Sequence, residues 1–136
     1  MRKLTGIVFA IIILTLPYQL SAATFDGSLP LLCAFTEVFE CSIDRGCKEG
    51  TAEDMNIPQF IRIDVSKNMV SSAEANEEKR ESIIKNLEHN NGMLIMQGVE
   101  SGRGWNVVIA EDTGHMSGTA TEDEGGFVFF GACTLD

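Results

Sequence analysis

Apolar and polar residues alternate along much of the chain beyond residue 30, with the period of two that half-buried strands show. The run LLCAFTEVFEC predicts a strand over residues 31–41, and Glu37 interrupts its apolar face. That face is expected to contain Cys33, Phe35, Phe39 and Cys41. The run QFIRIDV predicts a second strand over residues 59–65, with isoleucine and valine on one side and arginine and aspartate on the other.

The segment between these two strands is more polar. Residues 41–56 contain Gly46 and few apolar positions, so we expect a loop there. A turn and a short strand around Met69 and Val70 are predicted to follow the second strand.

Residues 73–89 fit two interpretations. A helix would place Glu81 and Lys85 at the i,i+4 spacing of a stabilising ion pair. The other interpretation is a loop followed by a strand over residues 82–89. The pair Asn91-Gly92 favours the strand, because this pair is a strong signal for a two-residue hairpin turn and a hairpin needs a strand on each side.

Four regularly spaced strands are predicted after Gly92, with turn residues between them. They are the runs MLIMQGV, WNVVIA, HMSGTAT and FVFFGACT. Short strands joined by hairpins predict an all-β fold, a small antiparallel meander closing into a barrel or sandwich of roughly eight strands. A barrel of that size is filled by its own side chains or holds one small ligand.

The first residues read as a secretory signal peptide. Arg2 and Lys3 precede an apolar run from Gly6 to Leu16, and small residues follow before Thr24. An apolar run of 11 residues is short for a membrane-spanning helix, which needs about 20. We therefore expect residues 1–23 to be cleaved and residues 24–136 to form one acidic domain, without a permanent membrane span, in the periplasm or outside the cell.

Charge narrows the classes of partner. Removal of residues 1–23 would leave 8 basic against 20 acidic residues, a formal charge of −12. Nucleic acid is excluded as a partner on this basis, because phosphate binding needs clustered lysine and arginine. A cationic protein is compatible with such a charge, although acidity also serves solubility alone.

All four cysteines lie in the predicted domain, where an oxidising compartment favours two disulfide bonds. Cys33 and Cys41 would stand about 26 Å apart in one strand, at roughly 3.3 Å per residue, so they cannot pair. Cys47 follows Cys41 across a segment that holds Gly46. The predicted pairs are therefore Cys41 with Cys47 and Cys33 with Cys133, the second joining the first strand to the last.

The residues offer little catalytic chemistry. The sequence contains none of the motifs of serine hydrolases, zinc proteases or phosphate-binding loops, and its two histidines, His89 and His115, lie beside predicted turns. We predict no metal site and no cofactor. The acidic clusters at residues 111–112 and 122–124 lack calcium-loop spacing and fall at predicted hairpin tips.

The run GVESGRGW is the most distinctive local feature. Arg103 at a hairpin tip and Trp105, the only tryptophan, are our candidate binding residues, because both types are favoured at interface hot spots. The structural interpretation is that the glycines supply turn geometry and that Trp105 packs inward with Val107 and Ile109.

Several stretches together resemble a family of small exported bacterial proteins of unknown function. They are FDGSLPLLCA, IPQFIRID, a hydrophobic strand ending in QG, GRGW and GFVFFGACT. The resemblance covers most of residues 24–136; it implies export and brings no activity, cofactor or catalytic residue. A looser likeness, of architecture alone, is to periplasmic lysozyme inhibitors, whose sequence motif is not found here.

Three functional hypotheses follow. The first is an exported, non-enzymatic binding module, in its most concrete form an inhibitor of a cationic hydrolase such as lysozyme or a protease. The second is a carrier of a small apolar ligand among the aromatic rings of the barrel, which would need a cavity of roughly 300 Å³ or more. The third is a hydrolase that uses two facing carboxylates.

Overall fold

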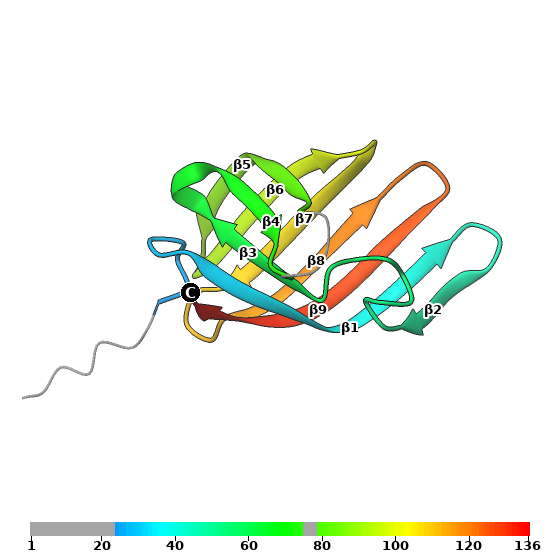
Figure 1. The fold of residues 1–136 in the computed structure, drawn as a ribbon, viewed down its shortest axis with the longest axis horizontal. Helices are drawn as coiled ribbons and strands as arrows, with labels where there is room; N and C mark the ends of the chain where they lie inside the picture. Colours follow the sequence, from blue (N-terminus) through cyan, green and yellow to red (C-terminus); the bar gives the residue numbers. More distant parts are fainter. Residues whose placement is uncertain (1–23, 75–78) are drawn as a thin grey trace, which may run out of the picture.

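The computed structural model describes residues 24–74 and 79–136, which form an all-β fold (Figure 1). The strands of the described residues are β1 (Leu31–Ser42), β2 (Gly46–Gly50), β3 (Phe60–Asp64), β4 (Met69–Ser72), β5 (Glu81–Asn90), β6 (Met93–Glu100), β7 (Arg103–Ala110), β8 (His115–Thr121) and β9 (Gly125–Leu135). One short 3₁₀ helix, η1 (Val65–Lys67), joins β3 to β4. The predicted signal peptide lies outside the described residues and stays a prediction.

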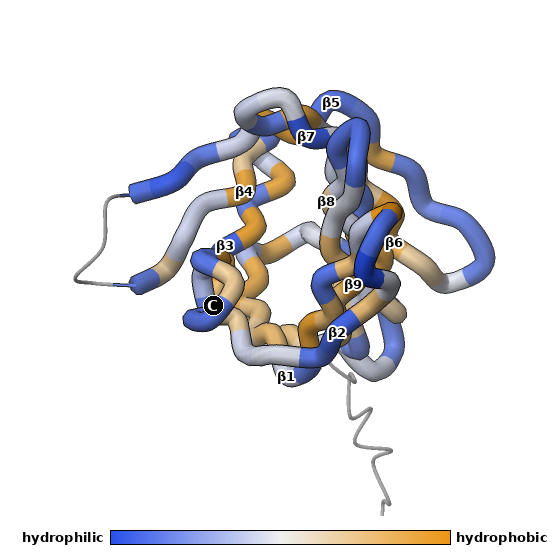
Figure 2. The backbone as a smooth tube through the Cα atoms, turned by 90° about the vertical axis from the view of Figure 1, so that its right-hand side faces the viewer, coloured by the Kyte–Doolittle hydropathy of each residue, from blue (hydrophilic) through white to orange (hydrophobic). Residues whose placement is uncertain are grey.

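The strands close into an antiparallel barrel. Strands β3 to β9 follow one another as a meander, and β1 pairs with both β3 and β9, so eight strands make a continuous ring. Figure 2 looks along this ring and shows the strands arranged around a common centre. The predicted all-β barrel is thus confirmed. In the parts of the chain that the structure describes, no helix has the length and apolar character to cross a bilayer.

Strand β2 lies outside the ring and extends β1 into an arm. The first half of β1 pairs with β3, and its second half pairs with β2 over Val38–Ser42. The prediction of a loop over residues 41–56 was therefore wrong for Gly46–Gly50. Polar composition concealed this strand because both of its faces are largely exposed, so no apolar alternation marks it.

A β-bulge in β1 changes which side chains face the core. The pairing of β1 with β9 shifts between Phe35 and Glu37, so Val38 is buried after the bulge and Phe39 turns outward. The prediction that Phe39 faces the interior was therefore wrong. Its ring packs instead against the ring of Phe130 on the outer surface, with centroids 6.4 Å apart.

The two central hairpins have the turns that the sequence predicted. Asn91 and Gly92 both have positive φ angles, of 50° and 73°, as do Ser101 and Gly102, at 49° and 82°. Two consecutive residues of this kind make the type I′ turn, whose twist matches that of the flanking strands. The strand before Asn91 is confirmed and begins at Glu81, whereas residues 75–78 of the ambiguous segment lie outside the described residues.

Both predicted disulfide bonds are present. Cys33 of β1 lies directly opposite Cys133 of β9, and Cys41 of β1 lies directly opposite Cys47 of β2, each pair with its Cα atoms 4.0 Å apart. The first bond joins the two strands that close the barrel and is buried in the core. The second joins the two strands of the arm.

One end of the barrel is densely filled, and we call it the closed end. Large side chains that are fully buried meet there: Leu31, Ile63, Leu94, Met96 and Ile109. The N-terminal segment covers them, since the backbone N–H of Phe25 donates to the carbonyl of Glu111 at 2.8 Å. Gly27, with φ of 79°, lies against Val65 of η1 and Leu94, so this segment packs directly on the core.

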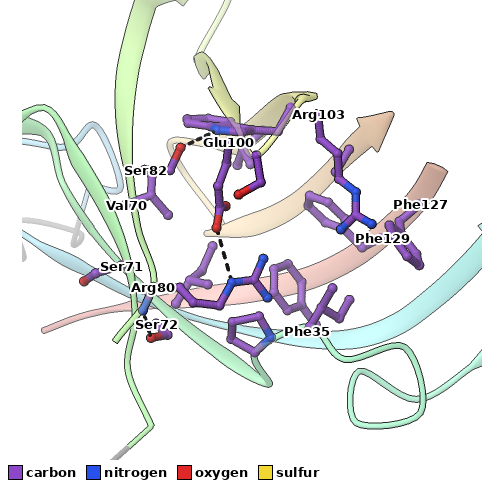
Figure 3. A pocket seen from close by; sticks show the side chains of 17 residues that line it. Phe35, Val70, Ser71, Ser72, Arg80, Ser82, Glu100, Arg103, Phe127 and Phe129 are labelled. Carbon is purple, nitrogen blue, oxygen red and sulfur yellow. Dashed lines mark hydrogen bonds and ion pairs between the residues drawn. The ribbon is translucent and has the colours of Figure 1, made fainter. Parts of the chain in front are cut away.

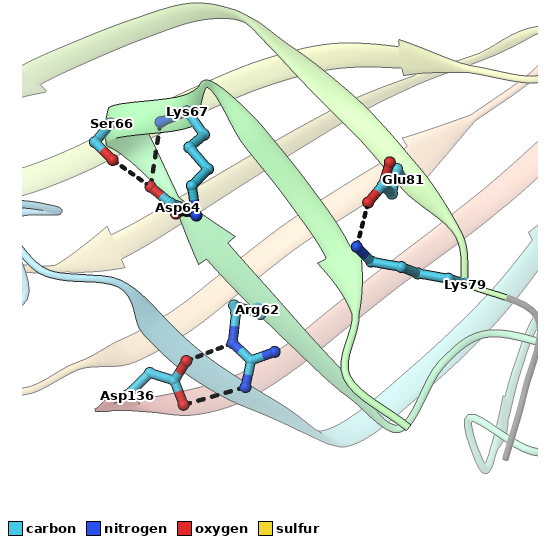
Figure 4. A network of polar contacts seen from close by, with 7 residues as sticks. All are labelled: Arg62, Asp64, Ser66, Lys67, Lys79, Glu81 and Asp136. Atoms are coloured by element: carbon cyan, nitrogen blue, oxygen red, sulfur yellow. Dashed lines mark hydrogen bonds and ion pairs between the residues drawn. The ribbon is translucent and has the colours of Figure 1, made fainter. Parts of the chain in front are cut away.

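A polar network fixes η1 at the closed end (Figure 4). The Asp64 carboxylate accepts hydrogen bonds from the Ser66 hydroxyl at 2.6 Å and the Lys67 backbone N–H at 3.1 Å, and it pairs with the Lys67 ammonium at 2.8 Å. These contacts favour the charged carboxylate and lower the pKa of Asp64 to about 2. Nearby, Arg62 of β3 binds the carboxylate of Asp136 and ties the C-terminus to the barrel.

The lowered pKa of Asp64 predicts a specific pH dependence of stability. A carboxyl group whose folded-state pKa lies below its ordinary value stabilises the fold above about pH 4 and loses that contribution as the pH falls toward about 2. The variant Asp64→Asn should therefore be less stable than the wild type at pH 7, with a gap that narrows below pH 4. Urea midpoints across this range measure the gap, and a constant gap would contradict the assignment.

Candidate functional site

The opposite end of the barrel, which we call the open end, gathers the features that suggest binding. It is formed by the turn at Ser101-Gly102, the turn over residues 122–124 and the β1–β2 arm (Figure 1). Small residues occupy the inward positions of the strands toward this end: Ser72, Ser82, Gly98, Gly118 and Ala120. The interior is therefore less completely filled here than at the closed end.

An apolar cavity of about 130 Å³ opens at this end (Figure 3). Aromatic rings form much of its wall: Phe35, Trp105, Phe127 and Phe129. Phe35 packs edge to face on Phe129, with ring centroids 4.8 Å apart, so part of the space between the strands is filled by these rings. The cavity is smaller than the roughly 300 Å³ set above for a carrier, so a large enclosed ligand does not fit.

Two glycines determine where the rings lie. A Cβ atom at Gly98 would come within 2.2 Å of the Trp105 ring, and one at Gly118 would come within 2.5 Å of the Phe129 ring. Each glycine thus leaves the space that an aromatic ring on another strand occupies. From the sequence, Gly98 was predicted to supply turn geometry alone, because nothing in a single sequence indicates which ring covers a strand glycine.

Trp105 points inward, as its alternation with Val107 and Ile109 predicted. Its indole N–H donates a hydrogen bond of 2.7 Å to the hydroxyl oxygen of Ser82, which is itself buried. This bond satisfies the one polar atom of the ring and fixes its orientation in the cavity wall.

Arg80 spans the mouth of the cavity. Its guanidinium group pairs with Glu100 at 3.2 Å (Figure 3), and it also donates to the backbone carbonyl of Asn56 at 3.2 Å. The side chain therefore connects β5, the end of β6 and the segment before β3. Sequence reasoning missed this residue, because Arg80 lies where the helix and strand interpretations of residues 73–89 diverged.

Arg103 stands on another side of the mouth. It begins β7 directly after the turn, pairs with Glu122 at 3.0 Å and places its guanidinium group 5.5 Å from the centre of the Phe127 ring. The two predicted binding residues, Arg103 and Trp105, thus both line the cavity, one at its mouth and one in its wall.

The second hollow at the open end is an acidic groove. It has a volume of about 520 Å³ and lies between the tip of the β1–β2 arm and the turn that precedes β9. Its charged lining residues are Glu40, Asp44, Arg45, Glu122, Asp123 and Glu124. The backbone N–H of Ile43 donates to the carbonyl of Glu124 at 3.1 Å and connects the two walls.

Ile43 projects from the tip of the arm with 77% of its surface exposed, more than any other large apolar residue of the described chain. Three residues, Ile43 to Arg45, link the two strands, and the Cys41–Cys47 bond closes the hairpin immediately behind them. Ile43 was not a predicted site residue, because its exposure at a hairpin tip depends on β2, which was predicted as a loop.

The apolar cavity offers apolar surface and a few hydrogen-bonding groups. The apolar cavity has one carboxylate in its lining, Glu100, and Arg80 neutralises it, so this cavity does not hold the facing pair that a two-carboxylate hydrolase needs. His89 lies elsewhere, exposed and bonded to Glu111 at 2.6 Å. Among residues 24–74 and 79–136, no three histidine, cysteine or acidic side chains are arranged to hold a metal ion.

No family model, no curated protein and no solved structure matches this chain.

Proposed function

We propose that this protein is an exported binding protein that docks on a cationic protein through its open end, most concretely as an inhibitor of a basic hydrolase. The observation that carries the proposal is the β1–β2 arm, which presents an exposed isoleucine beside an acidic groove and is closed by a disulfide bond. The two disulfide bonds, together with the signal peptide that the sequence predicts, support a periplasmic or secreted location.

The arm is held in one conformation before any partner arrives. The Cys41–Cys47 bond fixes the hairpin, and the Ile43 to Glu124 hydrogen bond fixes its tip against the neighbouring turn. A rigid loop loses little conformational entropy on binding, which is a large part of what weakens flexible binding segments. The arm is therefore suited to tight docking.

The tip combines an apolar anchor with surrounding charge. Ile43 can enter a pocket on a partner, while Asp44 and the acidic residues 122–124 lie around it. Interfaces commonly have this arrangement of a desolvated anchor within a polar rim. Four carboxylates besides Glu122, which pairs with Arg103, outnumber Arg45 in the groove and favour a partner surface that carries lysine or arginine.

The charge of the whole domain acts in the same direction. With residues 1–23 removed, a formal charge of −12 attracts basic proteins over a distance of about 10 Å at moderate ionic strength and raises their association rate. Binding should accordingly weaken as salt is added, mainly through slower association.

The direct test is inhibition and binding of two basic hydrolases, egg-white lysozyme and trypsin, by residues 24–136. We expect inhibition of at least one at low salt, with affinity reduced about tenfold or more by Ile43→Ala and by Asp44→Lys. The matched controls are Ile83→Ala, which makes the same truncation, and Glu88→Lys, which makes the same reversal of charge, both at exposed positions of β5. The proposal fails if neither enzyme is bound at low salt. It also fails if Ile83→Ala reduces binding as much as Ile43→Ala does, and Glu88→Lys as much as Asp44→Lys.

A further inference from the structure

The apolar cavity carries an inference that is independent of the proposed partner of the arm. We propose that this cavity binds one small uncharged aromatic molecule with a single polar substituent, of which a phenol is the simplest example. The size of the cavity, the side chains in its wall and the charges at its mouth all favour such a ligand.

Size comes first. A dry cavity of about 150 Å³ lined by apolar side chains binds benzene in another protein, and the cavity here measures about 130 Å³. The sequence leaves this space open, because Ser72, Ser82 and Ala120 occupy inward positions that leucine or isoleucine fill at the closed end. One six-membered ring is therefore the largest rigid apolar group that we expect it to enclose.

The wall contains a candidate hydrogen-bond donor, the hydroxyl of Ser72. The Ser72 side chain is buried, and its oxygen accepts a 2.9 Å hydrogen bond from the Arg80 backbone N–H. Among the described residues no acceptor is placed for the Ser72 hydroxyl hydrogen, although this residue lines the cavity. The indole N–H of Trp105 is already used by Ser82. A ligand oxygen that accepts from Ser72 would satisfy the remaining donor.

The charges at the mouth disfavour an anionic ligand. Arg80 pairs with Glu100 and Arg103 pairs with Glu122, so each cation at the rim already has a carboxylate partner. An aromatic carboxylate would have to displace one of these partners and then lie close to it, within a domain of strongly negative charge. An uncharged ring avoids both penalties.

Titration with 4-methylphenol, toluene and benzoate tests the proposal directly. Trp105 is the only tryptophan and stands in the cavity wall, so its fluorescence, excited where phenols do not absorb, reports occupancy without a label. We expect saturable binding of 4-methylphenol, weaker binding of toluene and none of benzoate. Binding of benzoate in preference to 4-methylphenol would overturn the assignment of an uncharged ligand, and no saturable change with any of the three would overturn the site.

Two variants locate the ligand. Ser72→Ala removes the hydroxyl donor. It should lower the affinity for 4-methylphenol about five- to tenfold and leave the affinity for toluene unchanged. Val70→Phe should fill the cavity and abolish binding of both 4-methylphenol and toluene. Ile83→Phe adds the same ring at an exposed position of β5 and should leave binding of both ligands unchanged. Equal effects of Val70→Phe and Ile83→Phe on ligand binding would contradict the site. Because these variants leave the arm intact, they should still bind the basic hydrolase if the proposed function is correct.

Discussion

Replacing Cys33 and Cys133 together by alanine is expected to lower the free energy of unfolding by about 4 to 5 kcal/mol. The bond closes a loop of 100 residues between the first and the last strand of the barrel, and in the chain-entropy model a long loop contributes most. Both side chains are also buried, so their truncation leaves a void beside the core. Urea unfolding of residues 24–136, oxidised throughout, measures the loss.

The second disulfide bond supplies the control for this experiment. Cys41 and Cys47 are six residues apart and lie in the arm, outside the barrel ring. Their joint replacement by alanine should lower stability by roughly 2 kcal/mol on the same model. Equal losses of stability from removing the two bonds would contradict the larger contribution that we assign to the Cys33–Cys133 bond, which closes the barrel.

Gly98→Ala is expected to lower the free energy of unfolding by about 2 kcal/mol, although it adds one methyl group to a strand. The new Cβ atom would lie 2.2 Å from the Trp105 ring and 2.6 Å from the backbone carbonyl oxygen of Ile83. The ring can move only by breaking its hydrogen bond to Ser82, and the carbonyl belongs to the neighbouring strand. A shifted emission of Trp105 should accompany the loss of stability.

Gly104→Ala is the matched control on the same hairpin. No atom lies within 4 Å of the position that its Cβ would take. The change should therefore leave stability within about 0.5 kcal/mol of the wild type and leave the Trp105 emission unchanged. Similar losses for the two variants would show that the effect of Gly98→Ala comes from strand propensity and not from contact with the ring.

The architecture was predictable where the sequence pattern is local. Alternation marked the strands from Met93 onward, the pair Asn91-Gly92 marked a two-residue hairpin turn, and the length of the first predicted strand excluded a bond between Cys33 and Cys41. These features depend on neighbouring residues alone. The barrel and both disulfide bonds followed from them.

The errors arose where pairing between distant strands decides the outcome. The β-bulge after Phe35 is a property of the pairing of β1 with β9, and it reverses the orientation of Phe39. Strand β2 is stabilised by its pairing with β1 and by the Cys41–Cys47 bond, not by an apolar face. Alternation within one segment contains neither kind of information.

The candidate site was predictable only in part. Arg103 and Trp105 were identified by residue type and do line the cavity. Arg80, Glu100 and Ser72 were not identified, because they meet only when β4, β5 and β6 are placed side by side. Ile43 was missed because an isoleucine in a polar segment is ordinary until the hairpin that exposes it is known.

The central claim is that the open end of the barrel, with the arm at its edge, is the binding surface. Backbone NMR of isotope-labelled residues 24–136, titrated with whichever basic hydrolase it binds, egg-white lysozyme or trypsin, tests it most directly. We expect shift changes concentrated in residues 40–47 and 122–126, with residues 88–92 and 111–114 at the closed end unaffected. Changes centred on the closed end, or no changes at low salt, would contradict the account.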